Sequence, residues 1–438
     1  MKMTTLCLDG YNLAMARGTG IATYGRSLLK AADSLEYRTE VLFGPQAPRS
    51  SSNVVNEANI IGAEGASFVR NPLEKFKRRL ERHFGAIGVQ AWPVGISGDV
   101  LWPERQGGMP RADGLWAAEN VFHRAQRTFR RHGRALSVTF DSDGVRRRPD
   151  IMHWTTALPL HARGVPNIYT VHDLIPLKAP HTTIHDRDAF MKLHAFVAKR
   201  ADHIVVVSEA TRRDVVRLLG VPEDRVTNTY QAAVSPEAYQ ARAEIDVMRE
   251  LESTFELGWK DYFIHYGAIE PKKNLGRIVE AFLASGSRRT LVVVGGRGWL
   301  QADETALIAQ VRKDAGSAAD RIRTYDYMSQ SHLISLIRGA RALLFPSLYE
   351  GFGLPVLEAM SLGTAVLTSN AGALPEVAGD AALRVEAEDV DAIRRGVQAL
   401  DEDEGLLREL ERLGPARART FSAEAYAERL RPLYAQFS

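Results

Sequence analysis

Short runs of apolar residues recur along the chain, separated by longer segments with a helical pattern. Three such runs lie in the first half and four in the second. Near-continuous apolar strands that alternate with helices are typical of parallel sheets covered on both faces. The alternation therefore predicts an α/β fold. The expected strands are Ile151–Trp154, Asn167–Val171, His203–Val207, Tyr262–Tyr266, Thr290–Val294, Ala342–Phe345 and Ala365–Thr368.

The expected strands form two sets, separated near residues 232–258. A chain of 438 residues is also too long for one ordinary core. We therefore expect two doubly wound domains, over 1–235 and 236–420. Ligands of such sheets bind beyond the carboxyl ends of the strands, and a cleft between two domains is a usual place for a site.

Composition narrows the class of protein. Hydrophobic residues make up 45% of the chain and charged residues 25%, as in ordinary soluble proteins. No run of eighteen apolar residues occurs, so no transmembrane helix is expected. The single Cys7 cannot form an internal disulfide, and the chain begins with the pattern of a strand rather than a signal peptide. These features predict a cytoplasmic location.

The segment from Tyr349 to Met360 carries the strongest chemical pattern. Glu350 and Glu358 are eight residues apart, and two glycines and Pro355 lie between them. Since an apolar run precedes the segment, we expect a strand, a tight loop and a helix with the proline in its first turn. Free N–H groups there bind anions, and the two carboxylates can accept hydroxyl groups. The pattern suits a nucleotide-sugar; the alternative is a core helix that carries two glutamates.

This segment resembles the Glu-x7-Glu signature of retaining glycosyltransferases with the GT-B fold, in particular family four. The resemblance extends over most of the chain. It implies two Rossmann-like domains that face each other across a cleft, with Glu350 on the donor sugar and Glu358 on the ribose. Residues between the two carboxylates would also contact the donor; they are Gly351, Phe352, Gly353 and Leu354.

The same resemblance affects two other parts of the chain. Residues 421–438 look like the helix that crosses back to the N-terminal domain in this fold. Residues 68–148 match the family worst, and we expect them to be a loop-rich insertion.

A second charged loop follows the expected strand at Tyr262–Tyr266. It contains Lys272 and Lys273, and a fixed cation there can stabilise the negative charge of a leaving diphosphate. The loop resembles the family's diphosphate loop, with Lys273 at the position of the usual lysine. The arginine common in the family is replaced by Ala268, so Lys272 or Arg297 would have to supply a second cation. The alternative is a solvated helix start.

His172 and Asp173 end another expected strand. A histidine in this place can hydrogen-bond a sugar hydroxyl or move a proton, and the resemblance places the pair near the donor sugar. We predict that His172 is catalytic and that Asp173 contacts the acceptor; an ordinary buried histidine is the alternative. Weaker predictions are acceptor contacts at His153, Trp154 and Ser208, donor contacts at Gly18 and Gly20, and a base contact near Tyr327.

Metal chemistry is not expected. Asp141 and Asp143 superficially match an Asp-x-Asp metal motif, but glycine and arginines around them favour a turn. The resemblance implies that helix dipoles and cations stabilise the diphosphate without a metal. We predict no metal and no cofactor.

The stretch 70–82 is strongly basic, and apolar residues recur through it at helical spacing. Such a helix can lie on an anionic membrane, or pack on the core with a solvated basic face. A second basic run extends from Arg124 to Arg134. No motif for nucleic acid accompanies these runs, so no nucleic-acid partner is predicted.

Together these features predict a retaining glycosyltransferase that moves a sugar from a nucleotide sugar to a saccharide or lipid-linked acceptor in surface polysaccharide synthesis. The motifs around His172 and Lys273 resemble those of bacterial mannosyl- and rhamnosyltransferases. GDP-mannose is therefore the first expected donor, with UDP-sugars and dTDP-rhamnose left open. Two alternatives remain: a sugar-nucleotide epimerase or isomerase, and a non-catalytic nucleotide-sugar-binding protein.

Overall fold

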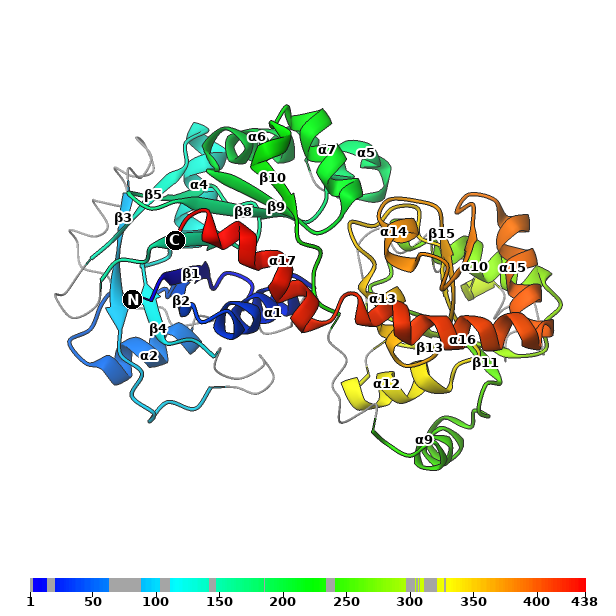
Figure 1. The fold of residues 1–438 in the computed structure, drawn as a ribbon. Helices are drawn as coiled ribbons and strands as arrows, with labels where there is room; N and C mark the ends of the chain where they lie inside the picture. The colour runs from blue at the N-terminus through cyan, green and yellow to red at the C-terminus, as the bar shows by residue number, and fades with distance from the viewer. Residues whose placement is uncertain are drawn as a thin grey trace.

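Two parallel α/β units, one from each half of the chain, make up the fold (Figure 1). The computed structural model describes residues 3–13, 20–62, 88–102, 111–141, 147–184, 186–233, 241–296, 304, 306, 308–310, 321–326 and 328–438. Among the helices in those ranges, none combines the length and the apolar character that crossing a membrane requires.

The N-terminal unit contains a sheet with the strand order β10-β9-β8-β6-β1-β2-β4-β3-β5-β7. Every pairing in it is parallel except that between β3 and β4. Its strands are β1 (Thr5–Asp9), β2 (Arg38–Phe43), β3 (Gly88–Val94), β4 (Gly114–Ala117), β5 (Leu136–Phe140), β6 (Ile151–Trp154), β7 (Leu160–Ala162), β8 (Asn167–Val171), β9 (His203–Val206) and β10 (Val226–Asn228). Its helices are α1 (Gly20–Ser34), α2 (Asn53–Ile61), α4 (Val121–His132), α5 (Ile175–Lys178), α6 (Arg187–Arg200) and α7 (Glu209–Leu219), with 3-10 turns at Pro180–Thr182 and Glu223–Arg225.

The C-terminal unit contains an all-parallel sheet with the order β13-β12-β11-β14-β15-β16. Its strands are β11 (Tyr262–Tyr266), β12 (Thr290–Val294), β13 (Ile322–Tyr325), β14 (Ala342–Phe345), β15 (Ala365–Ser369) and β16 (Leu383–Val385). Its helices are α9 (Glu244–Glu250), continued by a π-helical turn at Leu251–Phe255, then α10 (Leu275–Ala284), α12 (Gln330–Gly339), α13 (Leu354–Ser361), α14 (Leu374–Ala378), α15 (Val390–Glu402) and α16 (Glu404–Arg419), with a 3-10 turn at Pro271–Lys273.

The seven strands expected from apolar runs are all present, within one residue at their ends. Their side chains are almost completely buried, as expected for strands covered by helices on both faces. Helix α7 follows β9 directly. Ser208 accepts a hydrogen bond from the backbone N–H of Thr211 at its start, and Gly220 ends it in the left-handed region at a φ of 66°.

The described part of the stretch 68–148 is not the loop-rich segment that we expected. It contributes β3, β4 and β5 to the middle and far side of the first sheet. Trp116 is fully buried in β4, where its Nε1 donates to Glu40 at 2.5 Å. The prediction failed because β3 and β4 pair antiparallel, which breaks the alternation on which the strand assignment depended.

The last helix, α17 (Ala423–Ala435), leaves α16 and returns to the N-terminal unit (Figure 1). It packs against α1, where the Tyr24 and Tyr426 rings lie 6.3 Å apart. The domain boundary predicted near residue 235 stays a prediction, because residues 234–240 lie outside the described ranges.

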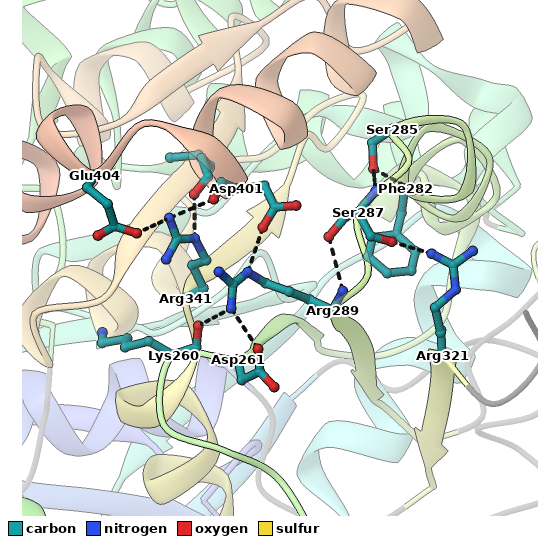
Figure 2. Close-up of polar contacts among 11 residues, drawn as sticks. Lys260, Asp261, Phe282, Ser285, Ser287, Arg289, Arg321, Arg341, Asp401 and Glu404 are labelled. Atoms are coloured by element: carbon teal, nitrogen blue, oxygen red, sulfur yellow. Dashed lines mark hydrogen bonds and ion pairs between the residues drawn. The ribbon is translucent and has the colours of Figure 1, made fainter.

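Two arginines fasten the helices to the amino edge of the second sheet (Figure 2). Arg341, directly before β14, donates to the carbonyl groups of Leu400 and Asp401 at 2.6 and 2.8 Å and to Glu404 at 2.7 Å. Arg289, directly before β12, donates to the Asp401 carboxylate at 2.5 Å. The junction between α15 and α16 is thereby held against the strands.

Candidate active site

The loop between β14 and α13 carries Glu350 to the carboxyl edge of the second sheet. Gly353, just before α13, has a φ of 108°, which glycine adopts without strain. A Cβ on Gly351 would lie 2.4 Å from the carbonyl oxygen of His172, so only glycine fits there. The loop therefore brings Glu350 directly against the end of β8 in the N-terminal unit.

Two lysines flank Glu350. The Lys273 Nζ donates to Oε1 of Glu350 at 2.5 Å, and the Lys272 Nζ lies 3.9 Å from Oε2. Lys272 also lies 3.4 Å from Oε1 of Glu270, and Lys273 lies 4.5 Å from the centre of the Phe345 ring. The two charged loops found in the sequence thus form one cluster, in which two ammonium groups share a buried carboxylate.

Burial and charge oppose each other in this cluster. Burial would raise the pKa of the Glu350 carboxyl, but Lys273 and Lys272 hold that pKa below its ordinary value. Burial would likewise lower the pKa of the Lys272 ammonium, but Glu350 and Glu270 raise it above its ordinary value. Both groups are therefore charged at neutral pH. Burial raises the pKa of Glu270, whose Oε2 is buried with no hydrogen-bond partner among the described residues.

Glu358 lies one turn into α13. The Tyr266 hydroxyl, at the end of β11, lies 2.9 Å from Oε2 of Glu358 and 2.8 Å from the carbonyl oxygen of Pro355. Burial raises the pKa of the Glu358 carboxyl. Tyr266 was not predicted as a partner of Glu358, although its place at the carboxyl end of a predicted strand was a usable signal.

His172 faces this cluster from the end of β8. Its Nε2 lies 2.8 Å from the carbonyl oxygen of Thr155, so Nε2 must carry a proton and donate. Burial lowers the pKa of His172, which favours the neutral ring. In that state Nδ1 is a hydrogen-bond acceptor. Asp173 caps the next turn by accepting the N–H of Ile175 at 3.0 Å.

A cavity of about 410 Å³ opens between the two units beside His172. Lys272 from the C-terminal unit contributes to its wall. Phe190 and His194 of α6 also line the cavity, and their rings stack at 3.9 Å between centroids. The structure thus brings His172, Asp173 and Lys272 to one cavity, as the carboxyl-edge rule suggested.

Two predicted acceptor contacts belong to the core instead. His153 is fully buried, with Nδ1 2.7 Å from the Tyr434 hydroxyl and Nε2 2.9 Å from the Thr170 hydroxyl. Burial lowers the pKa of His153 to about 3, so the ring is neutral. Trp154 is also fully buried, and its Nε1 donates to Asn167 at 3.0 Å. Their strand β6 lies in the middle of the sheet, where helices cover both faces.

One further site prediction is corrected, and two stay predictions. Ser208 is fully buried, and its side chain caps α7. The Phe352 side chain packs on Phe421 at 5.7 Å between ring centres, which leaves only its backbone for a donor. Gly20 begins α1 with open space around its Cβ position, and its contact with the donor stays a prediction.

Several predictions lie outside the described residues: Gly18, Tyr327, Arg297, Asp143 and the basic stretch 70–82. Within the described ranges, no group of three or more His, Cys, Asp or Glu side chains is placed to hold a metal ion. The absence of a metal requirement stays a prediction.

Comparison with known proteins agrees with this arrangement. Residues 99–230 match the model of Glycosyltransferase Family 4, and residues 250–417 match that of glycosyl transferases group 1. The O-antigen chain mannosyltransferase B of Escherichia coli is 34% identical over 263 residues, which cover 59% of this chain and 67% of that one. The serotype-specific mannosyltransferase WbdA of Escherichia coli is 29% identical over 320 residues, which cover 68% of this chain but only 38% of WbdA.

Among solved structures, Anabaena HepE in complex with UDP and glucose has a TM-score of 0.65 at 13% identity, over 99% of this chain and 100% of that one. At this identity the likeness shows the fold, which is GT-B. The fold and the family models together define a glycosyltransferase. The chain belongs to glycosyltransferase family 4.

Proposed function

We propose that the chain transfers mannose from GDP-mannose to a saccharide or lipid-linked acceptor in surface polysaccharide synthesis, with retention of the anomeric configuration. The observation that carries the proposal is the Lys273–Glu350 pair facing His172 beside the cavity between the two units. Relatives that are named mannosyltransferases support the choice of sugar.

The C-terminal unit binds the donor in this proposal. Lys273 and the first turn of α13 hold the diphosphate, whose charge grows as the sugar bond breaks. Lys272 supplies the second cation, because its ammonium is held charged beside Glu350 while Ala268 occupies the usual arginine position. Glu350 orients the sugar and Glu358 accepts the ribose hydroxyls.

The transfer itself proceeds on one face of the sugar. The bond between the anomeric carbon and the diphosphate oxygen breaks, and the acceptor hydroxyl forms the new glycosidic bond from the same side. The hydroxyl proton passes to the departing diphosphate oxygen. His172 accepts a hydrogen bond from the donor sugar at Nδ1, since Nε2 is committed to Thr155. The acceptor lies in the cavity near Asp173.

A panel of sugar nucleotides tests this proposal. Ligand binding to the folded state raises its apparent stability, so GDP-mannose should raise the melting temperature more than UDP- or dTDP-sugars. Lys273→Ala and Glu358→Ala should abolish that shift. The anomeric configuration of the first product, measured by NMR, decides retention. If no nucleotide sugar shifts the melting temperature, the donor site is misplaced.

The chain also binds the inner face of an anionic membrane in this proposal, through the basic stretch 70–82. The charge pattern supports it. Arg130 and Arg131, exposed at the end of α4, add positive charge to the same unit. Flotation with vesicles of phosphatidylglycerol should carry the protein and weaken with salt, whereas phosphatidylcholine vesicles should not. Equal binding to both would contradict this proposal.

A further inference from the structure

Helix α7 of the N-terminal unit touches the C-terminal unit at two points. The first is its amino end. Glu376 of α14 accepts the backbone N–H groups of Glu209 and Ala210 at 2.9 and 2.8 Å, one on each carboxylate oxygen. The Tyr230 hydroxyl adds a third bond to the same carboxylate at 3.2 Å. A carboxylate of one domain thus caps a helix of the other.

This cap supplies acceptors for backbone N–H groups at the start of α7 that have no partner within the helix. The first four N–H groups of any helix lack partners within the helix. In α7 the Ser208 side chain accepts the N–H of Thr211, and the Ser208 carbonyl accepts that of Arg212. The bond from Arg212 is the first one within the helix, and the N–H groups of Glu209 and Ala210, which precede it and have no carbonyl partner in the helix, are those that Glu376 takes. Both units are therefore needed to satisfy the start of α7.

The second point lies one turn further along α7. Asp214, only 5% exposed, accepts the Tyr349 hydroxyl at 2.5 Å. Lys178 joins the pair, with its Nζ 3.0 Å from the Asp214 carboxylate and 3.0 Å from the Tyr349 oxygen. The Lys178 ammonium also lies 4.6 Å from the centre of the Tyr349 ring. The ion pair between Lys178 and Asp214 lies within the N-terminal unit, and the Tyr349 hydroxyl of the C-terminal unit donates a hydrogen bond to it.

Both points are tied to the backbone of Glu350. Tyr349 is its neighbour in the chain. On the other side, the Glu350 carbonyl accepts the N–H of Ala373 at 3.0 Å, and a Cβ on Gly372 would lie 2.4 Å from the same oxygen. The segment that leads into Glu376 is therefore packed on Glu350. Any separation of the two contacts from α7 moves Glu350 away from the end of β8.

We propose that Glu376, Tyr349 and Asp214 are positioning residues that dock the C-terminal unit on α7 and thereby set Glu350 opposite His172. This inference rests on the proposed transferase function. A carboxylate on helix N–H groups forms charge-assisted bonds, which are short and directional. Two such contacts favour one relative placement of the domains, while water can replace them when the domains part. The docking is therefore reversible during turnover.

The test compares Glu376→Ala and Tyr349→Phe with the unchanged full chain. Three quantities are measured: hydrogen exchange at the Glu209 and Ala210 amides, kcat at saturating donor, and the Kd for GDP. We expect faster exchange at both amides in Glu376→Ala and a fall in kcat of about tenfold in each variant, as for one lost charge-assisted bond. The Kd for GDP should change less than about twofold, because the proposed diphosphate site lies in the C-terminal unit.

Matched controls are Glu409→Ala and Tyr37→Phe, which remove exposed partners outside this contact. Glu376→Gln keeps one acceptor oxygen and should give an intermediate kcat. Unchanged amide exchange and kcat in Glu376→Ala would overturn the proposal, and so would equal losses in kcat and GDP affinity. If the unchanged chain transfers no sugar, the proposed function fails, and amide exchange alone then decides the docking.

Discussion

The C-terminal sheet has a charge cluster at each edge, and the two clusters differ in how well their charges are satisfied. At the amino edge, Arg341 and Arg289 each make three hydrogen bonds to carboxylates and backbone carbonyl groups (Figure 2). At the carboxyl edge, Lys272 and Lys273 share Glu350, while an oxygen of Glu270 is buried with no hydrogen-bond partner among the described residues.

This difference separates a stabilising cluster from a reactive one. A guanidinium whose N–H groups are hydrogen-bonded within the protein, such as that of Arg341, holds helices to strands and has little capacity left to bind a ligand. Crowded ammonium groups around one carboxylate leave binding capacity for an anion, and perturbed pKa values gather at such places. Residue type alone does not distinguish the clusters, since both consist of basic and acidic side chains. The completeness of their hydrogen bonding does.

The largest expected effect is the loss of sugar-transfer activity in the variant Lys273→Ala. Removing the cation from the leaving diphosphate should lower kcat/KM about 10³-fold, equivalent to about 4 kcal/mol of transition-state stabilisation. Folding should be little affected, because Glu350 keeps Lys272 as a partner. Transfer assays and thermal melts check this, with a substitution of the exposed Lys30 in α1, Lys30→Ala, as control. Full activity in Lys273→Ala would mean that the crowded cluster is not the reactive one.

Arg341→Ala should give the reverse pattern. Its side chain is 4% exposed, and its loss leaves the carbonyl groups of Leu400 and Asp401 without their donor. We expect the free energy of unfolding in urea to fall by about 3 kcal/mol while kcat of the folded protein stays the same. Arg395→Ala, at a position 59% exposed, is the control. A loss of kcat without a loss of stability would contradict the comparison.

The sequence was enough to predict seven of the strands and the two charged loops, because apolar runs and Gly–Pro turns are local signals. It could not show that His153 is fully buried against Tyr434, since those residues are 281 positions apart. The docking of Tyr349 and Glu376 on α7 was missed for the same reason: both contacts join different domains. Strands β3, β4 and β5 were not predicted because one antiparallel pairing broke the alternation.

Lowering the pH should affect the carboxyl edge, because the buried His265 lies next to its cluster. Burial lowers the pKa of His265 to about 4, and its Nδ1 lies 2.9 Å from the carbonyl oxygen of Leu344. The unfolded chain therefore binds a proton first as the pH falls. The contribution of the neutral His265 to the free energy of unfolding is complete above pH 6.5 and decreases as the pH falls from 6.5 to about 4.

By pH 4.5 the loss from this group amounts to about 2–3 kcal/mol. His265→Asn keeps a polar side chain and cannot titrate, so its unfolding free energy should fall less between pH 7.5 and 4.5. Denaturant unfolding at the two pH values gives the difference between the proteins. Equal losses would mean that the pKa of His265 is not lowered in the folded state.

The smallest expected effect is that of Glu404→Gln at the amino edge. Glu404 is 58% exposed, and Arg341 keeps two backbone acceptors when the charge is removed. Exposed ion pairs contribute little, so the melting temperature should change by no more than about 1 °C and transfer should be unaffected. Glu350→Gln is the matched change at the other edge, where the carboxylate is buried between two lysines and transfer should collapse. If Glu404→Gln instead destabilises the protein as much as Arg341→Ala, the amino edge depends on paired charge rather than on satisfied carbonyl groups, and the distinction between the two clusters fails.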